Sequence, residues 1–152
     1  MAAKEPIHIC LLGTGNPLRT DDGAGIYCCE VIGKMEIPGL TIMTTQQLQS
    51  ELVPQLLGFD KVIVADASVQ HTQPVIYPFI PSSTPAQSSS HHMSIDLLYG
   101  LAHELYRRNI SFYCCAIPAK NLELGDKLSA SGKKQADKAV KLILEWIRSF
   151  KS

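Results

Sequence analysis

Two adjacent aspartates, Asp21 and Asp22, lie in the glycine-rich stretch GTGNPLRTDDGAG, directly after an apolar run. A third aspartate, Asp66, ends the apolar run VIVAD, and two histidines, His91 and His92, lie in the loop segment SSSHHMS, just before a region with helical periodicity. Carboxylate and imidazole groups together are suitable ligands for a first-row divalent metal. If these segments meet in space, two carboxylates and one imidazole would surround a crevice and leave positions on the ion open to other ligands.

Each of these residues also has a purely structural interpretation. Asp21 could cap the N-terminus of the helix that follows, and Asp22 in its first turn would interact favourably with the helix dipole. Asp66 could bond loop amides at the end of its strand, and the two histidines could be solvated loop residues. Asn16 is expected to hold the turn through side-chain bonds to the backbone. The case for a metal site therefore depends on several separate signals converging at one place.

The sequence lacks the familiar patterns of nucleotide-binding and hydrolytic enzymes. Gly13 and Gly15 begin a dinucleotide-binding pattern, but Leu18 stands where the third glycine is needed. Two carboxylates would also repel a pyrophosphate. There is no phosphate-binding Gly-Lys-Ser/Thr, no His-Glu-x-x-His and no Gly-x-Ser-x-Gly. Ser68 has no evident histidine partner, so the residues alone predict a metal-binding α/β domain without a self-evident nucleophile.

Apolar runs and helical stripes alternate along the chain and indicate how these residues are positioned. Strands are expected at residues 7–12, 40–44, 62–64, 75–79 and 110–116, the fourth at a sheet edge because prolines flank it. Helices are expected at residues 22–34, 50–57, 93–108 and 131–150. This order predicts an α/β fold: a three-layer α/β/α sandwich around a mostly parallel sheet of about five strands, forming a single domain over residues 1–152. Because ligands bind beyond the carboxyl ends of such strands, the aspartates are well placed for binding.

The overall composition narrows the classes of partner. The chain has 152 residues, 45% of them apolar, and its 14 basic and 14 acidic residues give a net charge of zero. A balanced charge argues against nucleic acid or an anionic membrane as a partner. No apolar run is long enough to span a bilayer and no signal peptide is evident, so we expect a cytoplasmic protein. Cys114 and Cys115 are expected to be free and to pack on opposite faces of one strand.

Taken together, four motifs resemble those of the hydrogenase maturation endopeptidases. They are GTGNPLRTDDGAG, VIVADAS, the Ser-x-His loop and the late stretch AIPAKNLELGDKLSASG, and the resemblance runs over residues 9–147. Members of this family remove a C-terminal extension from the large-subunit precursor of nickel-iron hydrogenases once nickel has been inserted. The resemblance implies the same activity here, with the hydrogenase large-subunit precursor as partner and with nickel carried by that substrate.

The resemblance also implies roles for individual residues. Asp22, Asp66 and His92 correspond to the family residues associated with metal recognition, and His91 is the alternative if the loop register differs by one. We take Asp22 and Asp66 as the candidate catalytic residues of an aspartic-type endopeptidase with metal-dependent recognition. The free protein need not hold a metal, although a divalent ion from solution could occupy the site, and we expect a monomer. The residues that shape the acidic turn are Gly13, Gly15, Asn16, Asp21, Gly23 and Gly25.

One departure from the family pattern follows the second expected strand. Many relatives have an Asp-Gly-Gly-Thr-like turn there, whereas this chain has TTQQLQS, so Gln46 and Gln47 offer side-chain amides where glycines would let a peptide approach closely. Two other functions use the same residues. The protein could be a nickel-sensing chaperone that docks on the precursor without cutting it, or an α/β domain that binds a small ligand.

Overall fold

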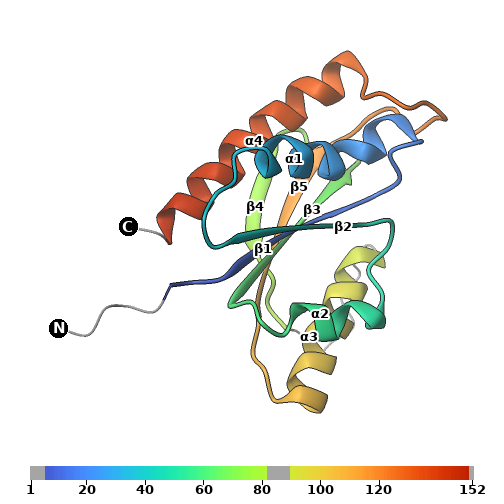
Figure 1. Ribbon diagram of the computed structural model, residues 1–152. Coiled ribbons are helices and arrows are strands. Elements are labelled where there is room, and N and C mark those ends of the chain that lie inside the picture. Colours follow the sequence, from blue (N-terminus) through green and yellow to red (C-terminus); the bar gives the residue numbers. More distant parts are fainter. Residues whose placement is uncertain (1–5, 82–89, 151–152) are drawn as a thin grey trace.

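A computed structural model describes residues 6–81 and 90–150, with residues 90–94 described as backbone only. Five strands form one sheet in the order β2-β1-β3-β5-β4 (Figure 1). Neighbouring strands are parallel except for β4, which pairs antiparallel with β5 at one edge. The strands are β1 (Ile9–Thr14), β2 (Leu40–Thr45), β3 (Lys61–Ser68), β4 (Val75–Pro78) and β5 (Ser111–Pro118).

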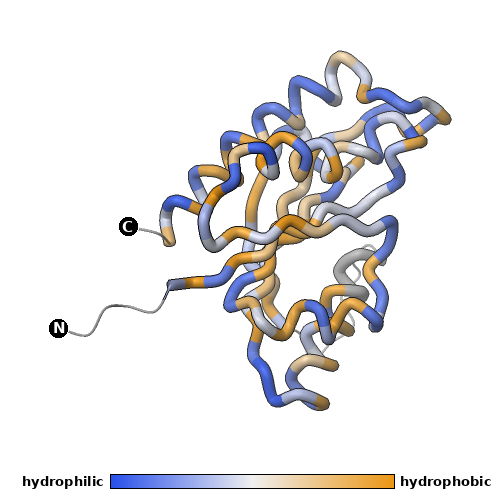
Figure 2. The backbone as a smooth tube through the Cα atoms, viewed as in Figure 1, coloured by the Kyte–Doolittle hydropathy of each residue, from blue (hydrophilic) through white to orange (hydrophobic). Residues whose placement is uncertain are grey.

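Helices cover both faces of the sheet. Helices α1 (Ala24–Gly33) and α4 (Ala130–Ser149) lie on one face, and α2 (Val53–Leu56) and α3 (Ser90–Tyr106) lie on the other (Figure 1). Two apolar clusters fill the two interfaces, and Figure 2 shows the hydrophobic residues concentrated along the central strands. The three-layer α/β/α sandwich with a mostly parallel sheet of five strands is thus confirmed. Among the described residues, no helix is long and apolar enough to cross a membrane.

The cysteines behave as small hydrophobic residues. All five are free and buried. Cys115 belongs to the cluster under α1 and α4, whereas Cys114 belongs to the cluster under α2 and α3, as the alternation of side chains along a strand predicts. The expected packing of this pair on opposite faces is therefore confirmed.

Several element boundaries differ from those expected. The helix expected at residues 22–34 begins as a 3₁₀ turn, η1 (Thr20–Gly23), before α1 starts. The helix expected at residues 50–57 is likewise divided into η2 (Ser50–Leu52) and the single turn of α2, whose start contains Pro54. Strand β3 continues through the polar end of its sequence to Ser68, because it pairs with β5 along its full length. The polar residues after VIVA are therefore held by the sheet.

A close approach between α1 and β3 fixes the position of the acidic turn relative to the sheet. A methyl group on Gly25 would lie 2.2 Å from the carbonyl oxygen of Ala65, a backbone atom that cannot rotate away. We expect Gly25→Ala to lower the free energy of unfolding by about 1–3 kcal/mol, the usual cost of overpacking a core. Urea denaturation followed by circular dichroism measures the change.

Gly58→Ala is the matched control for this substitution, because a methyl group there would meet no atom within 4 Å. Its free energy of unfolding should stay within about 0.5 kcal/mol of the unsubstituted protein, as for most surface changes. If Gly25→Ala and Gly58→Ala lowered the free energy of unfolding equally, the close approach of Gly25 to Ala65 would not be the reason for a glycine in α1.

Candidate active site

The turn after β1 positions the carboxylate of Asp22. The backbone N–H of Asn16 donates to Asp22 Oδ2 at 2.8 Å, and the side-chain oxygen of Asn16 accepts from the N–H of Leu18 at 2.9 Å. Gly15 has φ of 138°, and a Cβ atom there would lie 2.0 Å from the carbonyl oxygen of Asp22. Only glycine fits this position. The turn therefore holds Asp22 half-buried at the carboxyl end of β1.

Asp21 has a different role from the one expected. It caps neither η1 nor α1, whose N-cap residues make no side-chain capping bond. Its fully buried carboxylate instead reaches the N-terminus of α4, where Oδ1 accepts from the backbone N–H of Ser129 at 2.8 Å. The Ser129 hydroxyl lies within 2.9 Å of both carboxylate oxygens, and Asn121 N–H donates to Oδ2 at 3.3 Å. The expectation of a local helix cap is wrong because these partners lie about a hundred residues away in sequence.

Two other glycines of the acidic turn region make close contacts with neighbouring backbone. Gly13 lies in β1 and Gly23 ends η1, and both are buried. A Cβ atom on Gly13 would lie 2.7 Å from the carbonyl oxygen of Gly25. The glycines therefore allow the turn, β1 and α1 to contact one another through their backbones.

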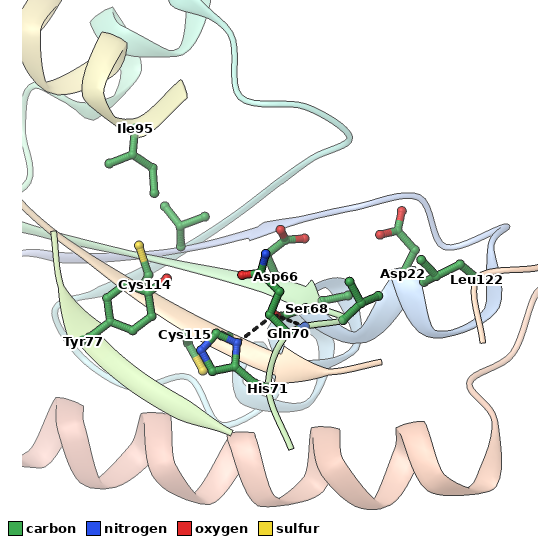
Figure 3. Close-up of a pocket in the computed structure, with 14 residues that line it drawn as sticks. Asp22, Asp66, Ser68, Gln70, His71, Tyr77, Ile95, Cys114, Cys115 and Leu122 are labelled. Atoms are coloured by element: carbon green, nitrogen blue, oxygen red, sulfur yellow. Dashed lines mark hydrogen bonds between the residues drawn. The ribbon is translucent and has the colours of Figure 1, made fainter. Parts of the chain in front are cut away.

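Asp66 and Asp22 line the same cavity, which has a volume of about 270 Å³. Asp66 lies in β3 opposite Ala116, and its side chain projects to the α3 side of the sheet, as does that of Val64 two residues earlier. Figure 3 shows the carboxylates of Asp22 and Asp66 on this same side. The fold thus brings together two carboxylates that are 44 positions apart (66 − 22) at the carboxyl ends of β1 and β3.

The two candidate histidines occupy a different element from the one expected. His91 and His92 lie in the first turn of α3 and not in a loop before the helix. Their side chains lie outside the described part of the structure, so their role as metal ligands stays a prediction. Ile95, slightly further along the same helix, lines the cavity and brings the start of α3 near it. Within residues 6–81 and 95–150, no three His, Cys, Asp or Glu side chains form a group that could hold a metal ion.

A serine–histidine pair in the cavity was missed by the sequence analysis. The Ser68 hydroxyl lies 2.7 Å from Nδ1 of His71, and both residues line the cavity that contains the two aspartates. The interpretation that Ser68 has no histidine partner is therefore wrong. The spacing of three residues after the end of a buried strand could have indicated the pair, since a tight turn there brings the two side chains together.

The other reactive side chains in this cavity are held in their neutral forms. Burial raises the pKa of Cys114 to about 11 and that of Cys115 to about 12. Burial and interaction with the Cys114 thiol raise the pKa of Tyr77 to about 12. These thiols and this phenol stay protonated near neutral pH. Gln46 and Gln47 are exposed beyond β2 and do not line this cavity.

Solved structures of known proteins share this fold, although no family model matches the sequence and no curated protein does. The NiFe hydrogenase maturation protease HybD from Thermococcus kodakarensis is 21% identical with a TM-score of 0.73, over 92% of this chain and 99% of that chain. The hydrogenase maturating endopeptidase HybD from E. coli is 19% identical with a TM-score of 0.76, over 94% and 93%. The maturation protease HycI from Thermococcus kodakarensis is 21% identical with a TM-score of 0.69, over 91% and 90%. Over nearly its whole length, the chain has the fold of the NiFe hydrogenase maturation proteases.

Proposed function

We propose that this protein is an endopeptidase that removes the C-terminal extension of a nickel-iron hydrogenase large-subunit precursor. The main support is that Asp22 and Asp66 line one cavity beyond the carboxyl ends of β1 and β3. That is the position at which open parallel sheets bind their ligands. The fold shared with maturation proteases and the acidic turn motif agree with this function.

The proposal includes recognition of nickel that the substrate carries. Carboxylate oxygens and an imidazole nitrogen are suitable ligands for a first-row divalent ion. Asp22 and Asp66, with His92 from the first turn of α3, would contact the nickel that the precursor already holds. Cleavage would then occur only after nickel insertion, because the precursor without metal lacks the group that these side chains bind. We also expect the protein to act as a cytoplasmic monomer.

The decisive experiment compares nickel-loaded with nickel-free precursor. Each is mixed with the purified protein, and the products are weighed by intact mass spectrometry. We expect the loaded precursor to lose one C-terminal peptide of defined mass and the nickel-free precursor to stay intact. A large subunit that already lacks the extension is the control and should not be shortened.

Three other results would contradict the proposal. Cleavage of both precursors at equal rates would show that nickel is not recognised. A stoichiometric complex with uncut precursor would indicate a nickel-sensing chaperone. Thermal stabilisation by nucleotides with no response to divalent metals would favour a small-ligand-binding domain, since a ligand that binds the folded state raises its stability.

A further inference from the structure

The turn after β3 places a hydroxyl and an imidazole side by side within the candidate active site. Ser68 and His71 are both half-buried, and their Oγ and Nδ1 atoms are 2.7 Å apart (Figure 3). The ring of Tyr77 stacks on the imidazole with a centroid distance of 6.5 Å and an interplanar angle of 21°. The His71 imidazole therefore contacts Ser68 through a ring nitrogen and Tyr77 through its ring face.

The hydrogen bonds around Ser68 are compatible with donation of the hydroxyl proton to His71. Ser68 Oγ already accepts from the backbone N–H of Gln70 at 3.2 Å. In the tautomer that carries its proton on Nε2, His71 can accept the hydroxyl hydrogen of Ser68 at Nδ1. A serine that donates to an imidazole has the arrangement of an activated nucleophile and its base.

The position of Ser68 relative to Asp66 suits an attack on a substrate whose metal is bound nearby. The two residues lie two positions apart in β3, so their side chains leave the same face of the strand, with Cα atoms roughly 6–7 Å apart. A peptide whose nickel contacted Asp66 would pass close to the Ser68 hydroxyl. The two thiols in the cavity, Cys114 and Cys115, are protonated and react poorly.

We propose that Ser68 is the nucleophile and His71 the base of the cleavage reaction, an inference that rests on the proposed function. Ser68 Oγ forms a bond to the scissile carbonyl carbon while its proton passes to Nδ1 of His71. The imidazolium then gives that proton to the leaving amine as the C–N bond breaks, which releases the C-terminal peptide and leaves an ester on Ser68. Water attacks this ester with His71 as base, and the mature large subunit leaves with a free carboxylate.

Two variants and a covalent probe test this proposal. Ser68→Ala should lower the cleavage rate of nickel-loaded precursor by about 10³-fold or more, and His71→Ala by about 10²–10⁴-fold. Both variants should still bind the loaded precursor, because neither removes a carboxylate. The matched controls are Ser111→Ala, at the opposite end of the sheet, and His103→Ala in α3, which should cleave at the unsubstituted rate. A fluorophosphonate probe should add one mass increment at Ser68, and none in either active-site variant.

Two results would overturn the assignment. The first is cleavage by Ser68→Ala within threefold of the unsubstituted rate. This result would count against the assignment even if Ser68→Ala and His71→Ala both melted at lower temperature, because the pair would then only stabilise the turn. The second is failure of the probe to label Ser68 in the unsubstituted protein. The labelling needs no precursor, so it reports on the pair even if the protein does not cleave. If the unsubstituted protein does not cleave nickel-loaded precursor, that result counts against the proposed function and not against the serine–histidine pair.

Discussion

Asp21→Asn is expected to lower the free energy of unfolding by about 2–4 kcal/mol, because it weakens hydrogen bonds to a buried charged group and leaves a buried N–H group without an acceptor. The backbone N–H of Ser129 donates to one carboxylate oxygen and that of Asn121 donates to the other. An asparagine must turn its own NH₂ group toward one of these N–H groups in either orientation. The substitution also removes a negative charge beside the N-terminus of α4, where the helix dipole favours one. Urea denaturation followed by circular dichroism measures the loss.

Asp126→Asn is the control for this prediction, because Asp126 is an exposed residue of the same connection before α4. Its free energy of unfolding should stay within about 0.5 kcal/mol of the unsubstituted protein. If Asp21→Asn unfolds at the same urea concentration as the unsubstituted protein, the carboxylate does not stabilise the junction between the acidic turn and α4.

The network around Asp21 links stability to the position of the site. Thr20 and Asp21 both bond the segment that precedes α4, through Gly125 and Asn121. The same segment contributes Leu122 to the cavity wall (Figure 3). Asp21 therefore anchors the turn to the segment before α4, whereas its neighbour Asp22 lines the cavity. This division of roles explains why two adjacent carboxylates lie in one short turn.

The layers of the fold could be predicted from the sequence because the spacing of apolar residues distinguishes the buried strands from the amphipathic helices. The acidic turn and Asp66 could also be placed at the carboxyl ends of strands, since that follows from the strand order along the chain. The contact of Asp21 with Ser129 could not, because nothing local in the sequence indicates a partner 108 residues away. The pairing of Ser68 with His71 is local in the sequence, but it matches neither His-Glu-x-x-His nor Gly-x-Ser-x-Gly, so no catalytic motif indicates it.

Asp66→Asn and Asp22→Asn are each expected to reduce the cleavage rate of nickel-loaded precursor by about 10³-fold, because a metal contact supplies several kcal/mol and 1.36 kcal/mol is worth a factor of ten in rate. Asp22→Asn should fold normally, since the asparagine oxygen can still accept from Asn16 N–H while the amide faces the cavity. Precursor cleavage at saturating and limiting substrate measures the effect, with denaturation curves to verify folding.

The double variant tests whether the two carboxylates contact one ion. Residues that act through a single metal are expected to be strongly non-additive, so Asp22→Asn with Asp66→Asn should cleave little more slowly than the slower single variant. The control is Asp126→Asn, at an exposed residue outside the cavity lining, which should cleave at the unsubstituted rate. If the two single effects multiply, the carboxylates act independently, and a shared nickel contact at the ends of β1 and β3 is ruled out.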